Sequence, residues 1–326
     1  MGNGAVLTVI LPTHNHPSTL EFSIRSILQQ SFRNFHLVVI GDGVKEETRT
    51  VVKGFMEMDN RIVFLDVPKS IRHGETWRDK VIRDSFSEYI AYHGDDDLML
   101  PDHLETLLSE IEGSNFIHSL PIKVGKEGDL NLFPTDISIQ ECLDWYLSDQ
   151  VHTSFSLTGV VHSRELYMSL PIGWEEAPIG IPSDLFMWKK FFASAGFEGK
   201  SSTASTTIKL DASIRVGMSD AERRAEIEFW WNKTQEAKFQ ITWRQLTQQT
   251  AHNVAARQFL RILNLEVELN RLKQSPRNKD TDQKKEFIEM NDKLKLQLSL
   301  IQNSTIWRMS LPLRVFIGAL RKILRV

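Results

Sequence analysis

The amino-acid sequence predicts an α/β protein with a Rossmann-like, mostly parallel sheet and an α-helical, partly coiled-coil C-terminal extension. In the first hundred residues, short apolar runs alternate with amphipathic segments, as in a parallel sheet covered by helices. Three of these runs end directly in polar clusters. After Gly217 the sequence keeps a long helical register with scarcely any glycine. We therefore expect an α/β domain over 1–217, a helical and coiled-coil extension over 218–303, and a basic amphipathic tail over 304–326.

The predicted sheet begins with continuous apolar runs, which are typical of strands buried on both faces. Strands are expected over 6–11, 36–40 and 89–92, with a weaker one over 61–66. Helices are expected between them, over 18–30, 46–58 and 74–87, the first behind a Ser/Thr cap and a proline. This alternation is that of a doubly wound sheet, whose ligands bind at the carboxyl ends of the strands. The topology should therefore bring together the three clusters that follow the strong strands, Thr13-His14-Asn15, Asp42 and Asp95-Asp96-Asp97.

The rest of the chain is less regular and then becomes helical. Short strands are expected over 115–120, 156–162 and 203–210, and helices over 139–147 and 184–195. Two blocks with heptad spacing follow, separated by a polar break at Pro276: first Ile262, Leu265, Leu269 and Leu272, then Phe287, Met290, Leu294 and Ile301. These blocks predict two short coiled-coil segments and a homo-oligomer.

The composition excludes several classes of protein. Hydrophobic residues make up 41% and charged residues 25% of the 326, which rules out a disordered, collagen-like or disulfide-framework chain. A formal net charge of -3 gives no overall basic field, so nucleic acid is not an expected partner. The single cysteine, Cys142, cannot form an internal disulfide, and the N-terminus lacks a secretory signal. These features predict a cytoplasmic protein.

Three adjacent carboxylates, Asp95, Asp96 and Asp97, follow an apolar strand. They repel one another unless a cation lies among them, and oxygen ligands select Mg²⁺ or Mn²⁺. Such ions usually keep positions for water and substrate phosphates, which points to a phosphate-bearing substrate. The alternative is a solvated acidic turn that caps the helix after Pro101-Asp102.

Two further aspartates are candidates for function. Asp42 lies between two glycines at a strand end, where it could accept hydrogen bonds from a ligand, although Gly-Asp-Gly is also a common turn. Asp184 opens an amphipathic helix, and a helix cap is the ordinary explanation for such a residue. Three tryptophans could offer flat apolar faces to a ligand, but core packing is their commoner use; they are Trp145, Trp174 and Trp188.

The order of these motifs resembles the family 2 glycosyltransferases. The resemblance rests on Val6 to Asn15, Ser26 to Phe32, His36 to Gly43, and Glu88 to Asp97 followed by Pro101-Asp102. It is strong over 5–110 and weak over 111–217. It implies a GT-A nucleotide-sugar domain over 1–217 that transfers a sugar with inversion from a nucleoside diphosphate sugar to a glycan or lipid-linked glycan acceptor.

The resemblance also implies residue roles. Residues of the nucleotide-sugar site are Pro12, Thr13, Asn15, Asp42, Gly74, Arg78, Asp95 and Asp96, with Asp79 in place of the family's usual asparagine. The metal, Mn²⁺ or Mg²⁺, is assigned to Asp96 and Asp97, although which of the three adjacent aspartates binds it is open. Trp174 and Glu175 match the acceptor loop, and Asp184 matches the general base, preceded by Ser183 where the family usually has an acidic residue. Glu175 is the reserve candidate for the base.

Two other functions stay open. The departures at Asp79 and Ser183 leave room for a non-catalytic scaffold of the same fold that organises a polysaccharide assembly complex. A nucleotidyltransferase also needs a metal and such a sheet, but normally has a Gly-rich, basic loop after the first strand, unlike Pro12-Thr13-His14-Asn15. The chain lacks transmembrane helices and a Gln-x-x-Arg-Trp motif, which favours limited transfer over processive synthesis.

The last residues carry Trp307 and five basic side chains without an acid: Arg308, Arg314, Arg321, Lys322 and Arg325. A basic amphipathic helix of this kind can lie on an anionic membrane surface. The segment from Ser304 to Arg314 also resembles the tail that follows the coiled coil in bacterial cell-surface polysaccharide glycosyltransferases. We therefore expect peripheral contact with the inner face of the cell membrane; the alternative is packing on the coiled coil or on a second subunit.

Overall fold

The computed structural model describes residues 4–133, 135–149, 151 and 156–274. Contacts divide this part of the chain into two units. The first consists of residues up to Ser138 together with Leu143–Thr247, and it holds every site discussed below. The second consists of Ile139–Cys142 and the described residues from Gln248 onward. Among the described residues, no helix has both the length and the apolar character needed to cross a membrane.

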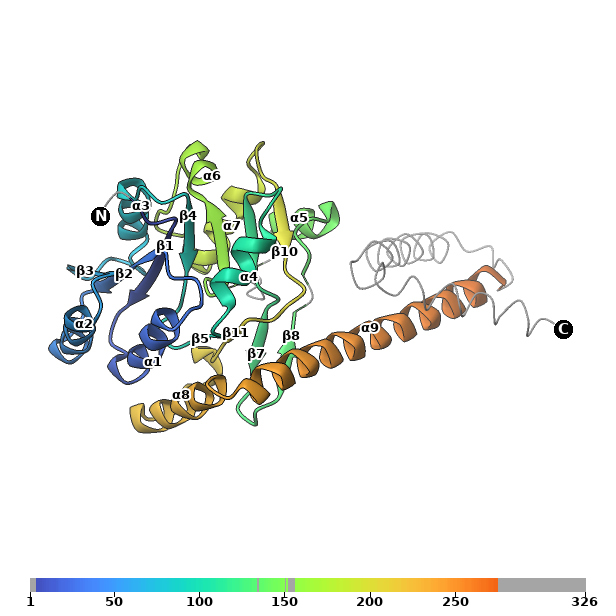
Figure 1. Cartoon of the computed structure of the whole chain (residues 1–326). Coiled ribbons are helices and arrows are strands. Elements are labelled where there is room, and N and C mark those ends of the chain that lie inside the picture. Colours follow the sequence, from blue (N-terminus) through green and yellow to red (C-terminus); the bar gives the residue numbers. More distant parts are fainter. Residues whose placement is uncertain (1–3, 134, 150, 152–155, 275–326) are drawn as a thin grey trace. The chain divides into compact units, whose positions relative to one another are not determined.

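A seven-stranded sheet forms the centre of the first unit, in the order β10-β6-β9-β4-β1-β2-β3 (Figure 1). Its strands are β1 (Leu7–Thr13), β2 (Phe35–Asp42), β3 (Ile62–Val67), β4 (Tyr89–Tyr92), β6 (Phe116–His118), β9 (Val160–Ser163) and β10 (Gly199–Ser201). The neighbours from β4 to β3 pair in parallel, whereas β9 runs antiparallel to both of its neighbours. The predicted α/β class with a mostly parallel sheet is confirmed.

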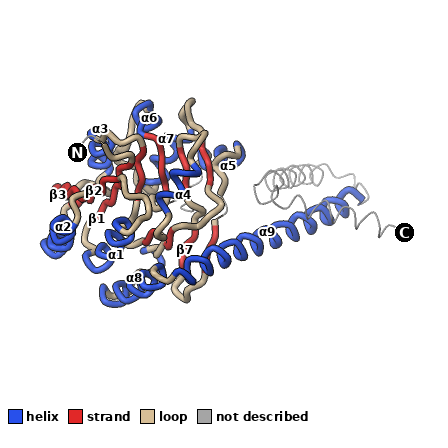
Figure 2. The backbone as a smooth tube through the Cα atoms, viewed as in Figure 1, coloured by secondary structure: helices blue, strands red, loops and turns tan. Residues whose placement is uncertain are grey.

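Helices lie on both faces of this sheet (Figure 2). They are α1 (Pro17–Leu28), α2 (Glu46–Met58), α3 (Glu75–Asp84), α4 (His103–Glu110), α5 (Gln140–Leu147), α6 (Arg164–Ser169) and α7 (Ser183–Phe192). Side chains alternate along a strand, so β1 supplies two separate cores. Val9 and Leu11 pack with Ile24 of α1, while Ile10 belongs to the core that contains Trp188 of α7. Burial on both faces explains the continuous apolar runs of β1 and β2.

Two small sheets were not predicted as such. Strand β5 (Leu98–Met99) pairs antiparallel with β11 (Thr207–Ile208), and β7 (Ile122–Val124) pairs with β8 (Leu130–Leu132). Sequence patterns favoured longer strands over 156–162 and 203–210, but β9 (Val160–Ser163) has only four residues and β11 only two. The pairing of β5 with β11 matters for the site, because it brings the residues after Ile208 beside the acidic motif.

The first unit continues past residue 217 into helix α8 (Asp220–Thr234) and the start of α9 (Ala237–Gln274). A capping box of Ser219 and Glu222 starts α8. Helix α8 packs on α1, where Arg224 donates to Glu21 at 2.9 Å, and Ile227 is fully buried. The first heptad block lies in α9, and its coiled-coil pairing stays a prediction. The second heptad block and the tail over 304–326 lie outside the described residues.

Arg215 and Glu226 fix α8 to the loop before it through two hydrogen bonds of 2.6 Å. The Arg215 side chain is only 1% exposed. We expect Glu226→Ala to lower the free energy of unfolding by about 3–5 kcal/mol, because it leaves a buried cation without its partner. Denaturant unfolding measures this loss. Glu228→Ala, at an exposed position of the same helix, is the matched control, and equal unfolding midpoints for the two variants would contradict the expectation.

Candidate functional site

The carboxyl ends of β4, β1 and β2 lie side by side, so the three polar clusters meet at one edge of the sheet. Strand β1 pairs with β4 and β2 on its two sides, up to Ile10 opposite Tyr92 and Thr13 opposite Gly41. Thr13 then donates to Asp95 Oδ2 at 2.7 Å, which joins the first and third clusters directly. The predicted convergence of the clusters is therefore what the topology produces.

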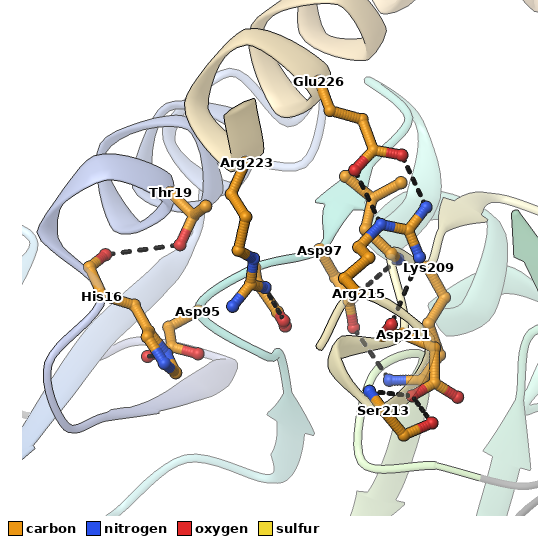
Figure 3. Close-up of polar contacts among 12 residues, drawn as sticks. His16, Thr19, Asp95, Asp97, Lys209, Asp211, Ser213, Arg215, Arg223 and Glu226 are labelled. Carbon is orange, nitrogen blue, oxygen red and sulfur yellow. Dashed lines mark hydrogen bonds and ion pairs between the residues drawn. The ribbon is translucent and has the colours of Figure 1, made fainter. Parts of the chain in front are cut away.

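Asp95 lies at the start of the acidic motif, beside the loop after β1 (Figure 3). Besides Thr13, its Oδ2 atom contacts His16 Nδ1 at 3.1 Å. This hydrogen bond is the main reason why the pKa of His16 is raised. His16 was not among the predicted site residues, since a single histidine after a strand carries no specific signal.

Asp96 is the second carboxylate of the motif, and its side chain is 14% exposed. Arg223 of α8 donates to its Oδ2 atom at 2.6 Å. Burial, together with the charges of Asp97 and Asp95, raises the pKa of Asp96 despite this arginine. An additional positive charge at Asp96 would therefore be favourable.

Asp97 has a different environment, because it is buried and both of its oxygens accept hydrogen bonds. Leu210 N donates to Oδ1 at 2.9 Å, and Oδ2 accepts from Thr158 Oγ1 at 2.5 Å and from Lys209 Nζ at 3.3 Å. Burial favours the protonated form, but the Lys209 charge outweighs it and the pKa of Asp97 is lowered. The assignment of Asp97 to the metal does not fit this geometry, since its oxygens are used within the fold.

The remaining carboxylates determine how a divalent ion would fit. No three His, Cys, Asp or Glu side chains converge as a ready metal site within the described ranges. Mg²⁺ and Mn²⁺, however, are often held by one or two carboxylates, with substrate phosphates and water completing the shell. Asp96, with the adjacent Asp95, could supply such carboxylate ligands.

Asp42 lies at the end of β2 and is buried. Its Oδ1 accepts from Ser70 N and its Oδ2 from Lys69 Nζ, both at 2.6 Å. Burial acts to raise the pKa of Asp42, but the bonds from Lys69 and Ser70 lower it overall. Gly74 has φ 76° and caps α3, and a Cβ there would come within 3.6 Å of the Asp42 Cβ. Lys69 was not among the predicted site residues, because it follows β3 without a recognisable motif.

The loop after β1 is held close to this aspartate. His14 Nδ1 lies 2.6 Å from the backbone oxygen of Asp42, and Asn15 Oδ1 accepts from Lys45 N at 3.0 Å. Pro12 is the penultimate residue of β1 and pairs with Ile40 of β2. The predicted nucleotide-site residues of these segments therefore lie together near the carboxyl ends of β1 and β2. They are Pro12, Thr13, Asn15, Asp42 and Gly74.

Arg78 of α3 is a buried cation with unused donors. Its Nη2 donates to His73 O at 2.7 Å, and its guanidinium lies 4.6 Å from the centre of the Trp174 ring. The Nε and Nη1 atoms are buried without a hydrogen-bond partner. Burial lowers the pKa of Arg78. A buried guanidinium with two free donors points to an anionic ligand.

The predicted acceptor residues differ in accessibility. Trp174 is buried, with one ring face against Arg78 and its Nε1 atom donating to Tyr92 OH at 3.0 Å. Trp174 and Trp188 are thus core residues here. Glu175 is 43% exposed and pairs with Lys190 at 2.5 Å. Asp79, at the family's asparagine position, accepts from Tyr167 OH at 2.7 Å.

Asp184 lies in the first turn of α7, and its Oδ1 accepts from Leu185 N at 2.8 Å. Burial raises the pKa of Asp184, although Lys209 and Arg78 act to lower it. Lys209 is close enough to Asp97, Asp96 and Asp184 for all three to raise its pKa. The positive charge of Lys209 therefore acts on both the acidic motif and Asp184. It was missed because the strand pattern over 203–210 does not indicate what its side chain contacts.

Comparisons with known proteins identify the family of the N-terminal half of the chain. The family described as "Glycosyl transferase family 2" matches residues 8–168. An "Uncharacterized glycosyltransferase" of Rickettsia bellii is 33% identical over 126 residues, which are 38% of this chain and 18% of that protein. The Campylobacter jejuni "GalNAc(5)-diNAcBac-PP-undecaprenol beta-1,3-glucosyltransferase" is 28% identical over 127 residues, 38% of this chain and 40% of that protein. The chain thus spans less than half the length of either relative.

A solved structure supports the fold over a longer stretch. S. aureus TarS 1-349 in complex with UDP-GlcNAc aligns with a TM-score of 0.52 at 14% identity, covering 70% of this chain and 66% of that one. This likeness concerns the fold. The family match, which runs from β1 to α6, shows that residues 8–168 belong to glycosyltransferase family 2.

Proposed function

We propose that this protein is an inverting glycosyltransferase that moves one sugar from a nucleoside diphosphate sugar to a glycan or lipid-linked glycan acceptor. One observation carries the proposal. At the edge of the sheet where the acidic motif follows β4, the buried Arg78 has two unpartnered nitrogens and interacts electrostatically with Asp42 and with Asp184, the carboxylate whose pKa burial raises. Such an edge could bind an anionic donor and a cation, and it supplies a carboxylate that could act as the general base.

The donor would bind along the ends of β1, β2 and β4. Arg78 would donate from Nε and Nη1 to the anionic part of the donor. Asp42 would accept hydrogen bonds from the nucleoside, since each of its oxygens keeps a second lone pair beyond the one used by Ser70 or Lys69. Asp96, with Asp95, would hold Mn²⁺ or Mg²⁺, which supplies positive charge for the departing diphosphate when bound.

Asp184 is the proposed base. The acceptor oxygen would form a bond to the anomeric carbon on the face opposite the diphosphate, while the bond from that carbon to the diphosphate oxygen breaks. The acceptor proton would pass to Asp184, which later releases it to water. A carboxylate with a raised pKa is a stronger base than an ordinary aspartate, and burial provides this property.

The acceptor is the less defined partner. Glu175 is the exposed candidate for acceptor contact, and Trp174 would support it from the core. The Campylobacter jejuni relative is named for a PP-undecaprenol substrate, which supports a lipid-linked acceptor for this chain. Such an acceptor would also suit the predicted contact of the tail with a membrane surface.

Calorimetric titration with UDP, GDP and dTDP, each with and without Mn²⁺, tests the donor site. We expect one nucleotide to bind in a metal-dependent manner and Asp96→Ala to weaken that binding at least about tenfold. Loss of an outer-shell partner alone already costs about 10–100-fold in metal affinity. Asp129→Ala, on the exposed turn between β7 and β8, is the matched control and should bind as the wild type does.

The opposite result is equally informative. If none of the three nucleotides bound under either condition, the donor-site assignment would fail and the non-catalytic scaffold would become the better description. If the product kept the anomeric configuration of the donor, the inverting mechanism and the role of Asp184 would be wrong while the donor site could stand.

A further inference from the structure

Helix α8 supplies a charged side chain to the acidic motif from outside the predicted catalytic domain. In Figure 3, Arg223 reaches from α8 toward the loop that carries Asp95 and Asp97. Its Nη2 atom lies 2.6 Å from Asp96 Oδ2, and each of the two side chains is 14% exposed. We propose that Arg223 is an exchangeable counter-ion, bound to Asp96 when the donor is absent and to the donor diphosphate when a metal ion occupies Asp96. This inference rests on the proposed donor site.

The distribution of charge at the motif supports this assignment. Both oxygens of Asp97 accept hydrogen bonds, from Lys209, Thr158 and the backbone, whereas Asp95 uses only Oδ2, which Thr13 and His16 contact. Among the described residues, no hydrogen bond joins Arg223 to Asp97 or to Asp95. Asp96 is thus the carboxylate that Arg223 neutralises, and it is also the best placed of the three to bind a divalent ion.

Metal binding and the Arg223 pair compete for the same carboxylate. A divalent ion at Asp96 would lie within a few ångströms of the guanidinium, where like charges repel strongly in a site with little water. A nucleoside diphosphate brings the compensating negative charge. A planar guanidinium can bind phosphate oxygens through two parallel hydrogen bonds, so the diphosphate is a suitable second partner for Arg223.

The exchange requires only a side-chain movement, because α8 itself is firmly held. Glu226, which lies one helical turn after Arg223, accepts two hydrogen bonds of 2.6 Å from the buried Arg215. Helix α8 also packs on α1, and its Ile227 is fully buried. These contacts keep the Arg223 backbone beside the motif while its long side chain changes partner.

This arrangement predicts reciprocal coupling between metal and nucleotide. Without nucleotide, the metal must displace Arg223 and binds weakly. With nucleotide, the displaced guanidinium gains the diphosphate, so each ligand strengthens the other by the same factor. Removing the Arg223 charge should reduce this coupling by improving the binding of the metal alone and weakening the metal-dependent binding of the diphosphate.

The test uses two titrations of the full-length protein. Mn²⁺ is titrated alone, with free and bound Mn²⁺ distinguished by electron paramagnetic resonance. Each of UDP, GDP and dTDP is then titrated calorimetrically in the presence of Mn²⁺. We expect Arg223→Ala to bind Mn²⁺ alone about fivefold more tightly and to bind the preferred nucleoside diphosphate with Mn²⁺ about tenfold more weakly, which lies within the usual range of coupling factors. Arg223→Gln, which keeps most of the side-chain volume, should show the same pair of changes. Arg223→Lys, which keeps the charge, should restore the weak binding of the metal alone.

Arg224→Ala is the matched control, because Arg224 is the next residue of α8 and pairs with Glu21 instead of the motif. It should leave both affinities unchanged. Equal affinity of wild type and Arg223→Ala or Arg223→Gln for Mn²⁺ alone would overturn the inference, as would weaker Mn²⁺ binding by these variants. If no nucleotide bound to the wild type, the proposed function would fail, whereas the competition between Arg223 and Mn²⁺ would still be decided by the metal titration.

Discussion

Replacing Asp184 with asparagine should slow sugar transfer by about 10²–10⁴-fold, the contribution that a positioned general base usually makes. The amide keeps the size of the side chain but cannot take the acceptor proton. Asp184 lies in the first turn of α7, and no hydrogen bond among the described residues joins it to the acidic motif, so donor binding should change far less than the transfer rate. Release of nucleoside diphosphate in the presence of a lipid-linked glycan acceptor measures the rate, and calorimetry with the nucleotide measures donor binding.

The pH dependence of the wild type provides the control for this variant. Burial raises the pKa of Asp184, and the base must be deprotonated to act, so the transfer rate should fall as the pH decreases through this raised pKa. In Asp184→Asn the residual rate should lose this acidic limb. Glu175→Gln tests the reserve candidate for the base. A large loss of rate in Glu175→Gln together with an active Asp184→Asn would contradict the assignment.

Asp97→Ala should lower the free energy of unfolding by about 3–5 kcal/mol, the range measured when one partner of a buried ion pair is removed. The Asp97 side chain is 1% exposed, and its loss would leave Lys209, Thr158 and the Leu210 amide without their acceptor. Denaturant unfolding followed by circular dichroism would measure the change.

Asp96→Ala is the natural comparison because it removes the neighbouring carboxylate. The charges of Asp97 and Asp95 raise the pKa of Asp96, so its removal relieves repulsion and should cost far less stability than the loss of Asp97. The two variants should therefore separate the motif into a structural carboxylate and a ligand-binding one. A stable Asp97→Ala protein that had lost metal binding would show instead that Asp97 binds the metal.

Local sequence patterns predicted the strands β1 to β4 of the central sheet but not its edge strand β10 or the small sheets beside it. The strands β1, β2 and β4 are buried on both faces, so their apolar runs and the polar clusters after them were visible directly in the sequence. The strands β5 and β11 have two residues each, and a pair this short has no recognisable period. Their existence depends on pairing across more than a hundred residues.

The contacts that distinguish the three aspartates are also long-range. Lys209 is 112 residues from Asp97, and Arg223 is 127 residues from Asp96. In the sequence, Asp95, Asp96 and Asp97 are equivalent, and only the residues that fold against them make one structural and leave another available. Trp174 is a similar case, since an aromatic residue in a loop does not reveal whether its ring faces solvent or, as here, Arg78 and Tyr92.

The packing of α8 determines which piece of the chain can be handled as an independent unit. Ile227 and Trp243 lie in one apolar cluster with Phe22, Leu98 and Leu100, beside the acidic motif. A chain cut at residue 217 would lose the covering of this cluster, the partner of Arg215 and the counter-ion of Asp96 in a single step. The smallest fragment that keeps the donor edge intact therefore extends to about Thr247, where the first compact unit ends.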